Sequence, residues 1–205
     1  MTTHVIEEVL PREIHKAPPA AVRTSTAPAL SLVAVHYRQP ELLRNMLFSL
    51  SREDVTFEVI IVNVSPDVLL PIPAHLPYPH RTVTAHNEGY AAAVNRGLGF
   101  ARGEFVAACN VDLEFRKGAL SEAVGYMRAH PDVGIIGPDL VFPGGGRQYS
   151  ARRFYTWKVA AWARVPWRSR AGFPSFYREH LMMDEQDDVA REVDWLTGAM
   201  LVVRR

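Results

Sequence analysis

Short apolar runs alternate with stretches of helical periodicity along most of the chain, starting at Leu30. This alternation predicts an α/β fold in which helices connect the strands of a largely parallel sheet. The expected strands are 30–37, 57–63, 82–85, 105–109 and 133–137, and the expected helices are 40–50, 89–101 and 118–130. A proline-rich loop reaching His80 separates the second strand from the third.

The first 29 residues differ from the rest of the chain. They mix proline, alanine, threonine and charge without a convincing period, so we expect residues 1–29 to form a flexible leader. Residues 30–205 then form one domain. A chain of 205 residues with 48% hydrophobic content and 22% charge is long and apolar enough for a single domain with a substantial core.

Charge, cysteine content and hydropathy exclude several classes of protein. The net charge of +1 does not indicate a surface built for nucleic acid, and the single cysteine, Cys109, excludes an internal disulfide framework. No apolar run approaches the roughly 20 residues needed to span a bilayer, and the N-terminus lacks the order of a signal peptide. We therefore expect a cytoplasmic protein that does not bind nucleic acid.

Residues 86–112, HNEGYAAAVNRGLGFARGEFVAACNVD, carry the most informative chemistry. A helix of small residues leads into an apolar strand, and Asn110 and Asp112 follow where that strand ends. Ligands of open α/β sheets gather beyond the carboxyl ends of the strands, so these two side chains stand where a ligand binds. Their hard oxygens suit Mg2+ or Mn2+ carrying a diphosphate. An ordinary turn formed by Asn and Asp is the alternative interpretation.

Five segments in order resemble one known family over most of residues 30–205. They are LSLVAVHYRQPELLRNMLFSL, FEVIIVNVS, HNEGYAAAVNRGL, ACNVDLEFRKGAL with HPDVGIIGPDL, and VDWLTGAMLVVRR. The chain resembles glycosyltransferase family 2, whose fold is the GT-A nucleotide-binding domain, and within it the bacterial rhamnosyltransferase-like branch. Ordered matches of this length are more specific than a single motif and favour a ligand site over a plain turn at residues 110–112.

The resemblance implies an inverting glycosyltransferase that moves a sugar, such as rhamnose, from a nucleoside-diphosphate donor to a cell-surface glycan or a polyprenyl-linked acceptor. It implies that Asp112 ligates the divalent metal, with Asn110 at the first position of the family's Asp-x-Asp element. The donor-binding residues implied are Val35, Tyr37, Asn63, Asn87, Gly89, Tyr90, Asn95, Asn110 and Asp112. The residues that match the acceptor side are Trp195, Thr197 and Gly198.

Four of these residues have a structural interpretation as well. Gly89 serves backbone geometry, Asn87 caps the following helix, and Asn95 is a surface amide. Trp195 either floors a sugar site with its flat ring or packs in the core.

Three features depart from the family pattern. Asn63 and Val64 stand where the family usually has Asp and Asn, which removes a carboxylate that commonly binds the nucleotide. Arg38 stands where the family usually has Asn after the first strand. Arg38 could bind a phosphate, but a solvated loop charge is the favoured interpretation. The chain ends at Arg205, before the acidic pair that supplies the catalytic base in the family, so we expect a truncated domain with an uncovered strand edge after Val203. No base is assigned among the remaining carboxylates, which are Asp184, Glu185, Asp187, Asp188 and Asp194.

The missing base leaves a second function open. A catalytically inactive fragment that binds a nucleotide sugar or another protein is the alternative to an active transferase. A nucleotidyltransferase is not supported, because it requires a glycine-rich, basic phosphate loop after the first strand and HYRQPELL supplies none.

Residues 147–178 are basic and aromatic and contain no acidic side chain. This composition suits an anionic membrane surface or a lipid diphosphate, and predicts peripheral contact with the inner face of the membrane. A packed helix whose arginines face water is the alternative interpretation. The basic residues are Arg147, Arg152, Arg153, Lys158, Arg164, Arg168, Arg170 and Arg178, and the tryptophans among them are Trp157, Trp162 and Trp167.

Overall fold

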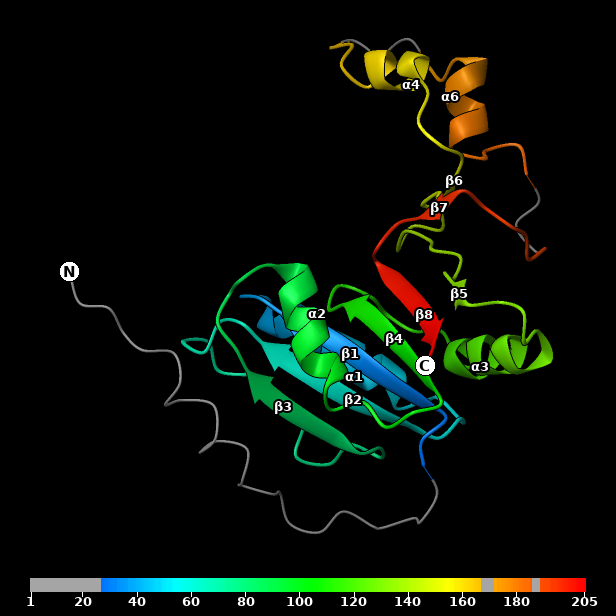
Figure 1. Ribbon diagram of the computed structural model, residues 1–205. Coiled ribbons are helices and arrows are strands. Elements are labelled where there is room, and N and C mark those ends of the chain that lie inside the picture. The colour runs from blue at the N-terminus through cyan, green and yellow to red at the C-terminus, as the bar shows by residue number, and fades with distance from the viewer. Residues whose placement is uncertain (1–26, 167–171, 186–188) are drawn as a thin grey trace.

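A computed structural model describes residues 27–166, 172–185 and 189–205 of the protein (Figure 1). The flexible leader was expected at residues 1–29, and residues 1–26 of it lie outside the described residues. Two parts can be distinguished. An α/β sheet with its helices forms the body of the molecule, and the described residues between 138 and 197, called the arm below, project away from it.

The body is built on a six-stranded sheet with the order β3-β2-β1-β4-β8-β5. Strands β3, β2, β1 and β4 are parallel to one another, whereas β8 runs antiparallel to both β4 and β5. The expected α/β class with a largely parallel sheet is confirmed. The strands are β1 (Leu30–His36), β2 (Phe57–Asn63), β3 (His80–Thr84), β4 (Phe105–Asn110), β5 (Ile135–Ile136) and β8 (Met200–Arg204).

The uncovered strand edge expected after Val203 is wrong. Val203 pairs with Val106 of β4 on one side and with Ile135 of β5 on the other, so β8 is an interior strand. The sequence did not indicate this, because β5 lies some 65 residues before β8 and has only two residues. The edge strands of this sheet are β3 and β5.

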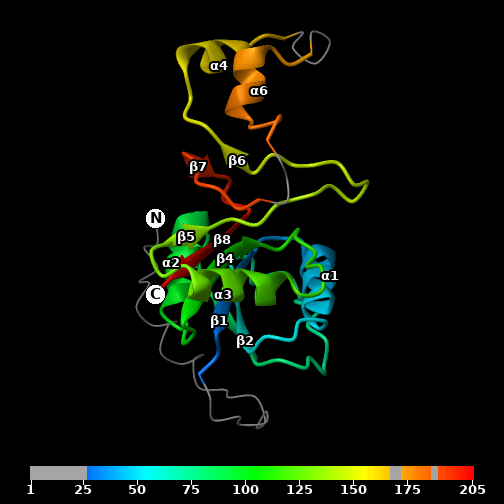
Figure 2. The ribbon, with the colours of Figure 1, turned by 90° about the vertical axis from the view of Figure 1, so that its right-hand side faces the viewer.

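Three helices cover the two faces of the sheet (Figure 2). They are α1 (Pro40–Leu50), α2 (Tyr90–Leu98) and α3 (Ala119–Ala129). Alternate strand residues face opposite sides, so Leu32 of β1 packs with α1 and α3 while its neighbour Val33 packs with α2. The α1 helix matches its expected bounds, whereas α2 is shorter than the expected 89–101.

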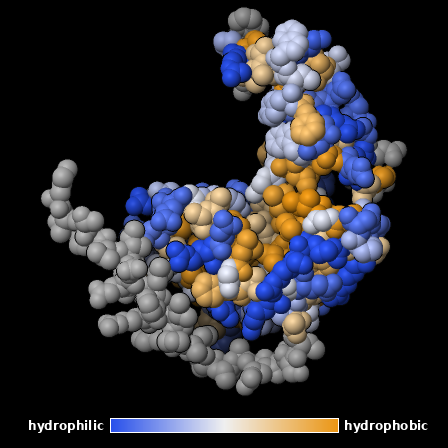
Figure 3. All heavy atoms as spheres, viewed as in Figure 1, coloured by the Kyte–Doolittle hydropathy of each residue, from blue (hydrophilic) through white to orange (hydrophobic). Residues whose placement is uncertain are grey.

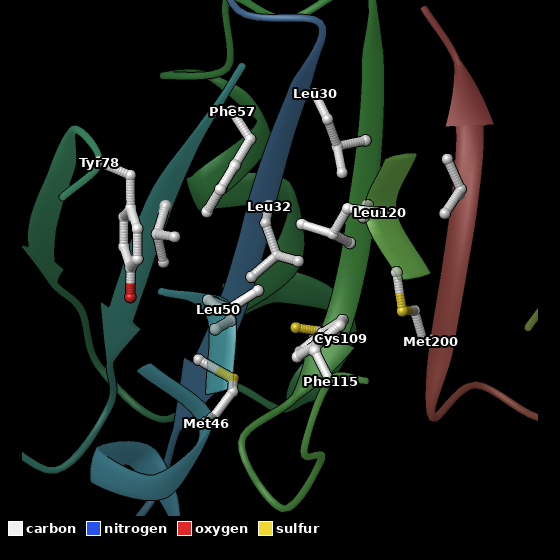
Figure 4. Packing of buried hydrophobic residues seen from close by; sticks show 14 of the residues in the cluster. Leu30, Leu32, Met46, Leu50, Phe57, Tyr78, Cys109, Phe115, Leu120 and Met200 are labelled. Atoms are coloured by element: carbon white, nitrogen blue, oxygen red, sulfur yellow. The ribbon is translucent and has the colours of Figure 1, made fainter. Parts of the chain in front are cut away.

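The larger core lies between the sheet and the pair α1 and α3. Figure 4 shows side chains from four strands and both helices pointing toward one another in this layer. Leu30, Leu50, Phe105 and Leu120 are completely inaccessible to solvent here. Burial of these apolar side chains is the main interaction that stabilises the sheet and holds its strands in register.

A buried polar cluster fixes the amino ends of β1 and β2. The Glu58 carboxylate accepts hydrogen bonds from Ser31 Oγ at 2.8 Å and from Arg102 Nε at 3.1 Å, and Ser31 Oγ accepts from the backbone N–H of Gly103 at 2.8 Å. Burial raises the pKa of Glu58, but the hydrogen bonds from Arg102 and Ser31 and the charge of Arg102 outweigh it, so the pKa is lowered overall. The carboxylate thus remains ionised in the core.

The arm consists of two short helices joined to the body by a two-stranded ribbon (Figures 1 and 2). Strand β6 (Ala151–Arg152) pairs antiparallel with β7 (Trp195–Leu196), and helix α4 (Trp157–Trp162) packs against α6 (Ser175–His180). None of the helices in the described ranges has the length and apolar character that a bilayer crossing requires. Figure 3 shows apolar side chains gathered where the arm meets β8 and β5.

The close packing at Gly103 yields a first prediction. A Cβ atom at this position would lie 2.5 Å from Ser31 N and 2.7 Å from Phe105 O, both of which are backbone atoms that cannot yield without moving a strand. We expect Gly103→Ala to lower the free energy of unfolding by about 2–4 kcal/mol, measured by urea denaturation. Gly125→Ala is the matched control, because Gly125 faces open space within α3 and alanine should stabilise that helix by up to about 1 kcal/mol. Equal stability of the two variants would contradict this account.

Candidate functional site

The register of the parallel strands brings their carboxyl ends to one edge of the sheet. His36 is level with Asn63, Asn63 with Thr84, and Val35 with Asn110. The chain leaves β1 toward β2 on one side, whereas β4 lies on the other side of β1. This reversal of strand order opens a crevice between β1 and β4, where ligands of open α/β sheets bind.

A hollow of about 290 Å³ occupies this crevice. Seven of the nine predicted donor residues line it, namely Val35, Tyr37, Asn87, Gly89, Tyr90, Asn110 and Asp112. The lining thus combines residues that are distant in sequence. They come from the end of β1, the start of α2 and the end of β4. Gln39, Val64 and Val111 also line it and were not predicted.

The first turn of α2 begins at the rim of this hollow. Gly89 precedes it with a φ of +100°, a left-handed conformation that other residues rarely adopt, so the backbone interpretation of Gly89 holds alongside its place in the lining. The Asn87 side chain accepts a hydrogen bond from the Gly89 N–H at 3.4 Å, but no side chain caps the helix. The uncapped amides and the helix dipole favour an anion at this point.

Asn110 and Asp112 occupy the end of β4 and the turn that follows it. The turn expected as an alternative is present at residues 111–112, and both polar side chains nevertheless line the hollow. Among the residues that the structure describes, no three His, Cys, Asp or Glu side chains come together as a metal site. One carboxylate and one amide oxygen fit an ion that keeps water ligands and binds together with a diphosphate.

Tyr90 presents a hydroxyl that stays protonated. Burial raises the pKa of Tyr90 to about 12, with further contributions from Cys109 and from the Asp112 carboxylate. Its ring still lines the hollow and is 42% exposed. A neutral phenol of this kind donates a hydrogen bond to an anionic ligand throughout the physiological pH range.

Asn63 lies beneath the hollow rather than in its lining. Its Oδ1 accepts hydrogen bonds from Ser65 N at 3.0 Å and from Ser65 Oγ at 3.2 Å, and contacts His36 Nδ1 at 3.1 Å. His36 Nε2 in turn accepts from the Gln39 N–H at 3.3 Å, so Nδ1 carries the ring proton. All three side chains of this cluster are buried. The cluster holds the loop after β1, which carries Tyr37 and Gln39 into the lining.

The other predicted residues near this edge face solvent. Asn95 is exposed on α2 and does not line the hollow. The Arg38 guanidinium is 61% exposed and pairs with Asp67 at 3.3 Å, which agrees with the solvated charge that the sequence favoured. Arg38 has a φ of +53°, and its N–H donates to Ser65 Oγ at 3.0 Å, so its backbone belongs to the same loop.

The predicted acceptor segment adjoins the hollow through one backbone contact. The Asn110 N–H donates to Ala199 O at 2.9 Å, which places the turn containing Thr197 and Gly198 beside the end of β4. Trp195 is half-buried, and its indole N–H donates to Arg153 O at 3.1 Å. With Phe154 and Tyr155, Trp195 lines a second, open hollow on the arm.

The ring of Trp195 is already partly covered. Its centroid is 5.7 Å from that of Tyr155 with the two planes 21° apart, and Arg152 Cζ lies 5.1 Å from the same ring. Tyr155, which the sequence did not single out, is 58% exposed and offers the freer aromatic surface.

The three described carboxylates considered as bases are engaged in ion pairs. Asp184 pairs with Arg178 and Glu185 pairs with Arg191. The third, Asp194, accepts a hydrogen bond from the Phe154 N–H at 2.8 Å, and its carboxylate lies 3.9 Å from the Arg153 guanidinium. None of these three lines the first hollow, and Asp187 and Asp188 lie outside the described residues.

The residues that sequence reasoning missed follow a simple positional rule. Gln39, Val64 and Val111 each come within three residues of the end of a parallel strand. His36 and Ser65 also lie at or just after the end of a parallel strand, but both are buried and do not line the hollow. Their position just after a parallel strand could therefore have identified these residues from the sequence. Their side-chain types could not, because they do not indicate ligand binding.

Comparison with protein-family models identifies the class of protein. The model for glycosyl transferase family 2 matches residues 31–185, which is more than half of the chain. The chain belongs to glycosyl transferase family 2, and the family predicted from the five segments is confirmed. A search of curated proteins found no match.

Two solved structures are similar to part of this chain. The mannosyltransferase PcManGT from Pyrobaculum calidifontis, in complex with GDP-Man and Mn2+, is 21% identical with a TM-score of 0.47 over 65% of this chain and 41% of that one. S. aureus TarS 1-349 in complex with UDP-GlcNAc is 18% identical with a TM-score of 0.48 over 61% of this chain and 38% of that one. The chain thus spans about two-fifths of the length of these structures.

The buried position of Asn63 yields a second prediction. Asn63→Leu removes the oxygen that accepts from Ser65 and faces His36; it leaves the buried Ser65 N–H without its acceptor and His36 Nδ1 with only the 3.4 Å contact to Ser65 Oγ. We expect the free energy of unfolding to fall by about 2–3 kcal/mol in urea denaturation. Asn95→Leu is the control, because that amide is exposed and its loss should change stability by no more than about 0.5 kcal/mol. Similar effects at both positions would exclude a supporting role specific to Asn63.

Proposed function

We propose that the protein is an inverting glycosyltransferase that transfers a sugar, rhamnose among the candidates, from a nucleoside-diphosphate donor to a cell-surface glycan or lipid-diphosphate acceptor. The observation that carries the proposal is the gathering of Asn110, Asp112 and five other predicted donor residues around one hollow at the strand-order reversal. Family membership supports the same reaction class. The proposal includes a cytoplasmic location at the inner face of the membrane.

The chemistry of the hollow suits a diphosphate. Asp112 and Asn110 would hold Mg2+ or Mn2+, and the bound ion would neutralise the negative charge that develops on the departing nucleoside diphosphate. The start of α2 adds backbone amides and the positive end of a helix dipole, and Tyr90 adds a neutral hydroxyl donor. Val35 and Tyr37 supply the apolar and aromatic surface that a nucleoside requires.

The acceptor is proposed to approach from the arm. The turn of Thr197 and Gly198 adjoins the donor hollow through the Asn110 and Ala199 hydrogen bond. Trp195 together with Tyr155 supplies aromatic surface against which the apolar face of a sugar ring can pack. An inverting displacement requires the incoming hydroxyl to reach the anomeric carbon from the side opposite the leaving diphosphate.

A second candidate function follows from the carboxylates. Asp112 is the one carboxylate among the described residues that line the hollow, and a metal-binding Asp112 is not free to accept the acceptor's proton. A chain that binds the nucleotide sugar without transferring it is therefore the alternative. Turnover distinguishes the two functions, since both require the donor site.

Removal of the Asp112 charge tests the donor site. We expect Asp112→Asn to weaken metal-dependent binding of the preferred nucleotide by about 10- to 100-fold, because Asp112 is the only carboxylate that the described part of the chain contributes to the lining. Calorimetric titration of UDP, dTDP and GDP with and without Mn2+ measures this effect. Asp132→Asn is the matched control, since Asp132 is exposed and distant in sequence from every lining residue.

The outcomes of that titration separate the hypotheses. Failure of all three nucleotides to bind would exclude a donor site for these nucleotides in this chain. Binding that survives Asp112→Asn would exclude Asp112 as the metal ligand. The protein could bind a nucleotide with metal yet release no nucleotide when it is incubated with the corresponding nucleotide sugar and an acceptor. That result would favour the inactive alternative.

The protonated hydroxyl of Tyr90 yields a separate prediction. We expect Tyr90→Phe to weaken nucleotide binding about five- to tenfold, through the loss of one hydrogen bond to a charged ligand. The difference between the two proteins should remain constant from about pH 7 to about pH 10, because the folded-state pKa near 12 keeps the phenol protonated over that range. Tyr126→Phe, on α3 and outside the hollow, should bind as the unmodified protein does. Loss of the difference below pH 10 would show that the hydroxyl ionises in the binding range.

A further inference from the structure

The outer end of the arm combines positive charge with aromatic side chains. Residues 147–178 carry eight arginine and lysine side chains and no aspartate or glutamate. Trp167, Arg168 and Arg170 of this set lie outside the described residues. The name tip is given below to α4, α6 and the described residues that flank them, 153–156, 163–166 and 172–174; α6 extends this segment to His180 and adds one acidic side chain, Glu179.

The tip has an inner and an outer side. On the inner side, Val159 is 1% exposed, and the Trp162 ring meets the Phe176 ring edge to face with centroids 6.3 Å apart. These contacts hold α4 against α6 and satisfy the apolar packing of both helices. A packed helix with its arginines in water, the alternative interpretation of the sequence, describes this inner side only.

Large aromatic rings remain exposed on the tip. Trp157 is 77% exposed, Phe154 is 69% exposed and Phe173 is 53% exposed. Trp157 and the exposed Ala161 are four residues apart and thus share one face of α4. Such a concentration of exposed rings in about 20 residues is unusual for a surface that meets only water.

Cations lie beside these rings. The Lys158 ammonium is 5.9 Å from the centre of the Trp157 ring. Arg164 is exposed three residues beyond Ala161, and its guanidinium donates to Ala160 O at 2.8 Å. An exposed ring and a cation are thus in contact on α4, and Arg164 and Arg153 are exposed near its two ends.

This combination matches the interface of an anionic bilayer. Tryptophan and phenylalanine partition into the boundary between headgroups and acyl chains, while lysine and arginine attract anionic headgroups from within a Debye length. The α4 helix is too short to cross a bilayer but long enough to lie in the interfacial plane. The tip is also the part of the arm farthest from the sheet, so its contact with a surface leaves the donor hollow open (Figures 1 and 2).

We propose that the tip is a peripheral docking site for an anionic phospholipid surface, with Phe154, Trp157 and Phe173 entering the interface and Lys158 and Arg164 binding the headgroups. This contact rests on the proposed function and extends it by holding the protein where a lipid-linked acceptor resides; Trp157, Lys158 and Arg164, the residues changed in the test below, line neither hollow. A nucleic acid is disfavoured as the occupant, because the net charge of the whole chain is only +1.

Sedimentation with vesicles tests the proposal on the full chain. We expect the protein to pellet with phosphatidylcholine vesicles that contain phosphatidylglycerol, to pellet much less with phosphatidylcholine alone, and to be released by high salt. Trp157→Ser should weaken binding roughly tenfold through loss of the inserted ring. Lys158→Gln combined with Arg164→Gln should weaken it by roughly 20- to 30-fold.

Matched variants on the body serve as controls. Phe48→Ser removes a ring that is 55% exposed on α1, and Lys117→Gln combined with Arg96→Gln removes one exposed lysine and one exposed arginine. These variants should pellet as the unmodified protein does. Metal-dependent nucleotide binding should be the same in the tip variants and the controls, so a failed donor site and a failed lipid site give different results.

Three outcomes would overturn the proposal. The first is equal binding to neutral and anionic vesicles, or tip variants that pellet like the controls. The second is tighter binding to a single-stranded oligonucleotide than to the anionic vesicles. The third is a concentration-dependent dimer, seen by analytical ultracentrifugation and abolished by Trp157→Ser, which would assign the exposed rings to contact between copies of the chain.

Discussion

The common register of β1, β2, β3 and β4 is the constraint on which the rest of the structure depends. Four parallel strands can expose their carboxyl ends at one edge only if each is held level with its neighbour, and the buried layer beneath α1 and α3 supplies that restraint. A shift of one residue would move every side chain of a strand to the opposite face of the sheet. The hollow between β1 and β4 is a direct consequence of this register.

Buried polar clusters secure the two ends of this arrangement. Ser31, Glu58 and Arg102 join the amino ends of the strands, whereas His36, Asn63 and Ser65 join the carboxyl ends. Both clusters connect β1 to β2 and then to a following loop. Because their hydrogen bonds are directional and largely shielded from water, they position loops more narrowly than apolar packing does. The carboxyl-end cluster gives Asn63 a supporting place under the site, where a direct ligand contact had been predicted.

The body and the arm divide two physical tasks. The body gathers side-chain oxygens, the amides at the start of α2 and a neutral phenol around one hollow. The arm presents aromatic rings and cations on a projecting support, first at Trp195 and Tyr155 and then at the tip. The hydrogen bond from the Asn110 N–H to Ala199 O holds the segment just after the arm beside the end of β4, next to the hollow.

The sequence by itself determined the alternation of strands and helices, the family, and seven of the residues that line the hollow, because each depends on local periodicity or on short motifs. Only the tertiary structure decided which of the predicted residues line the hollow. It buried Asn63, left Asn95 in solvent, and placed Tyr155 beside Trp195. It also inserted β8 between β4 and β5, since pairing between segments some 65 residues apart leaves no local pattern in either segment.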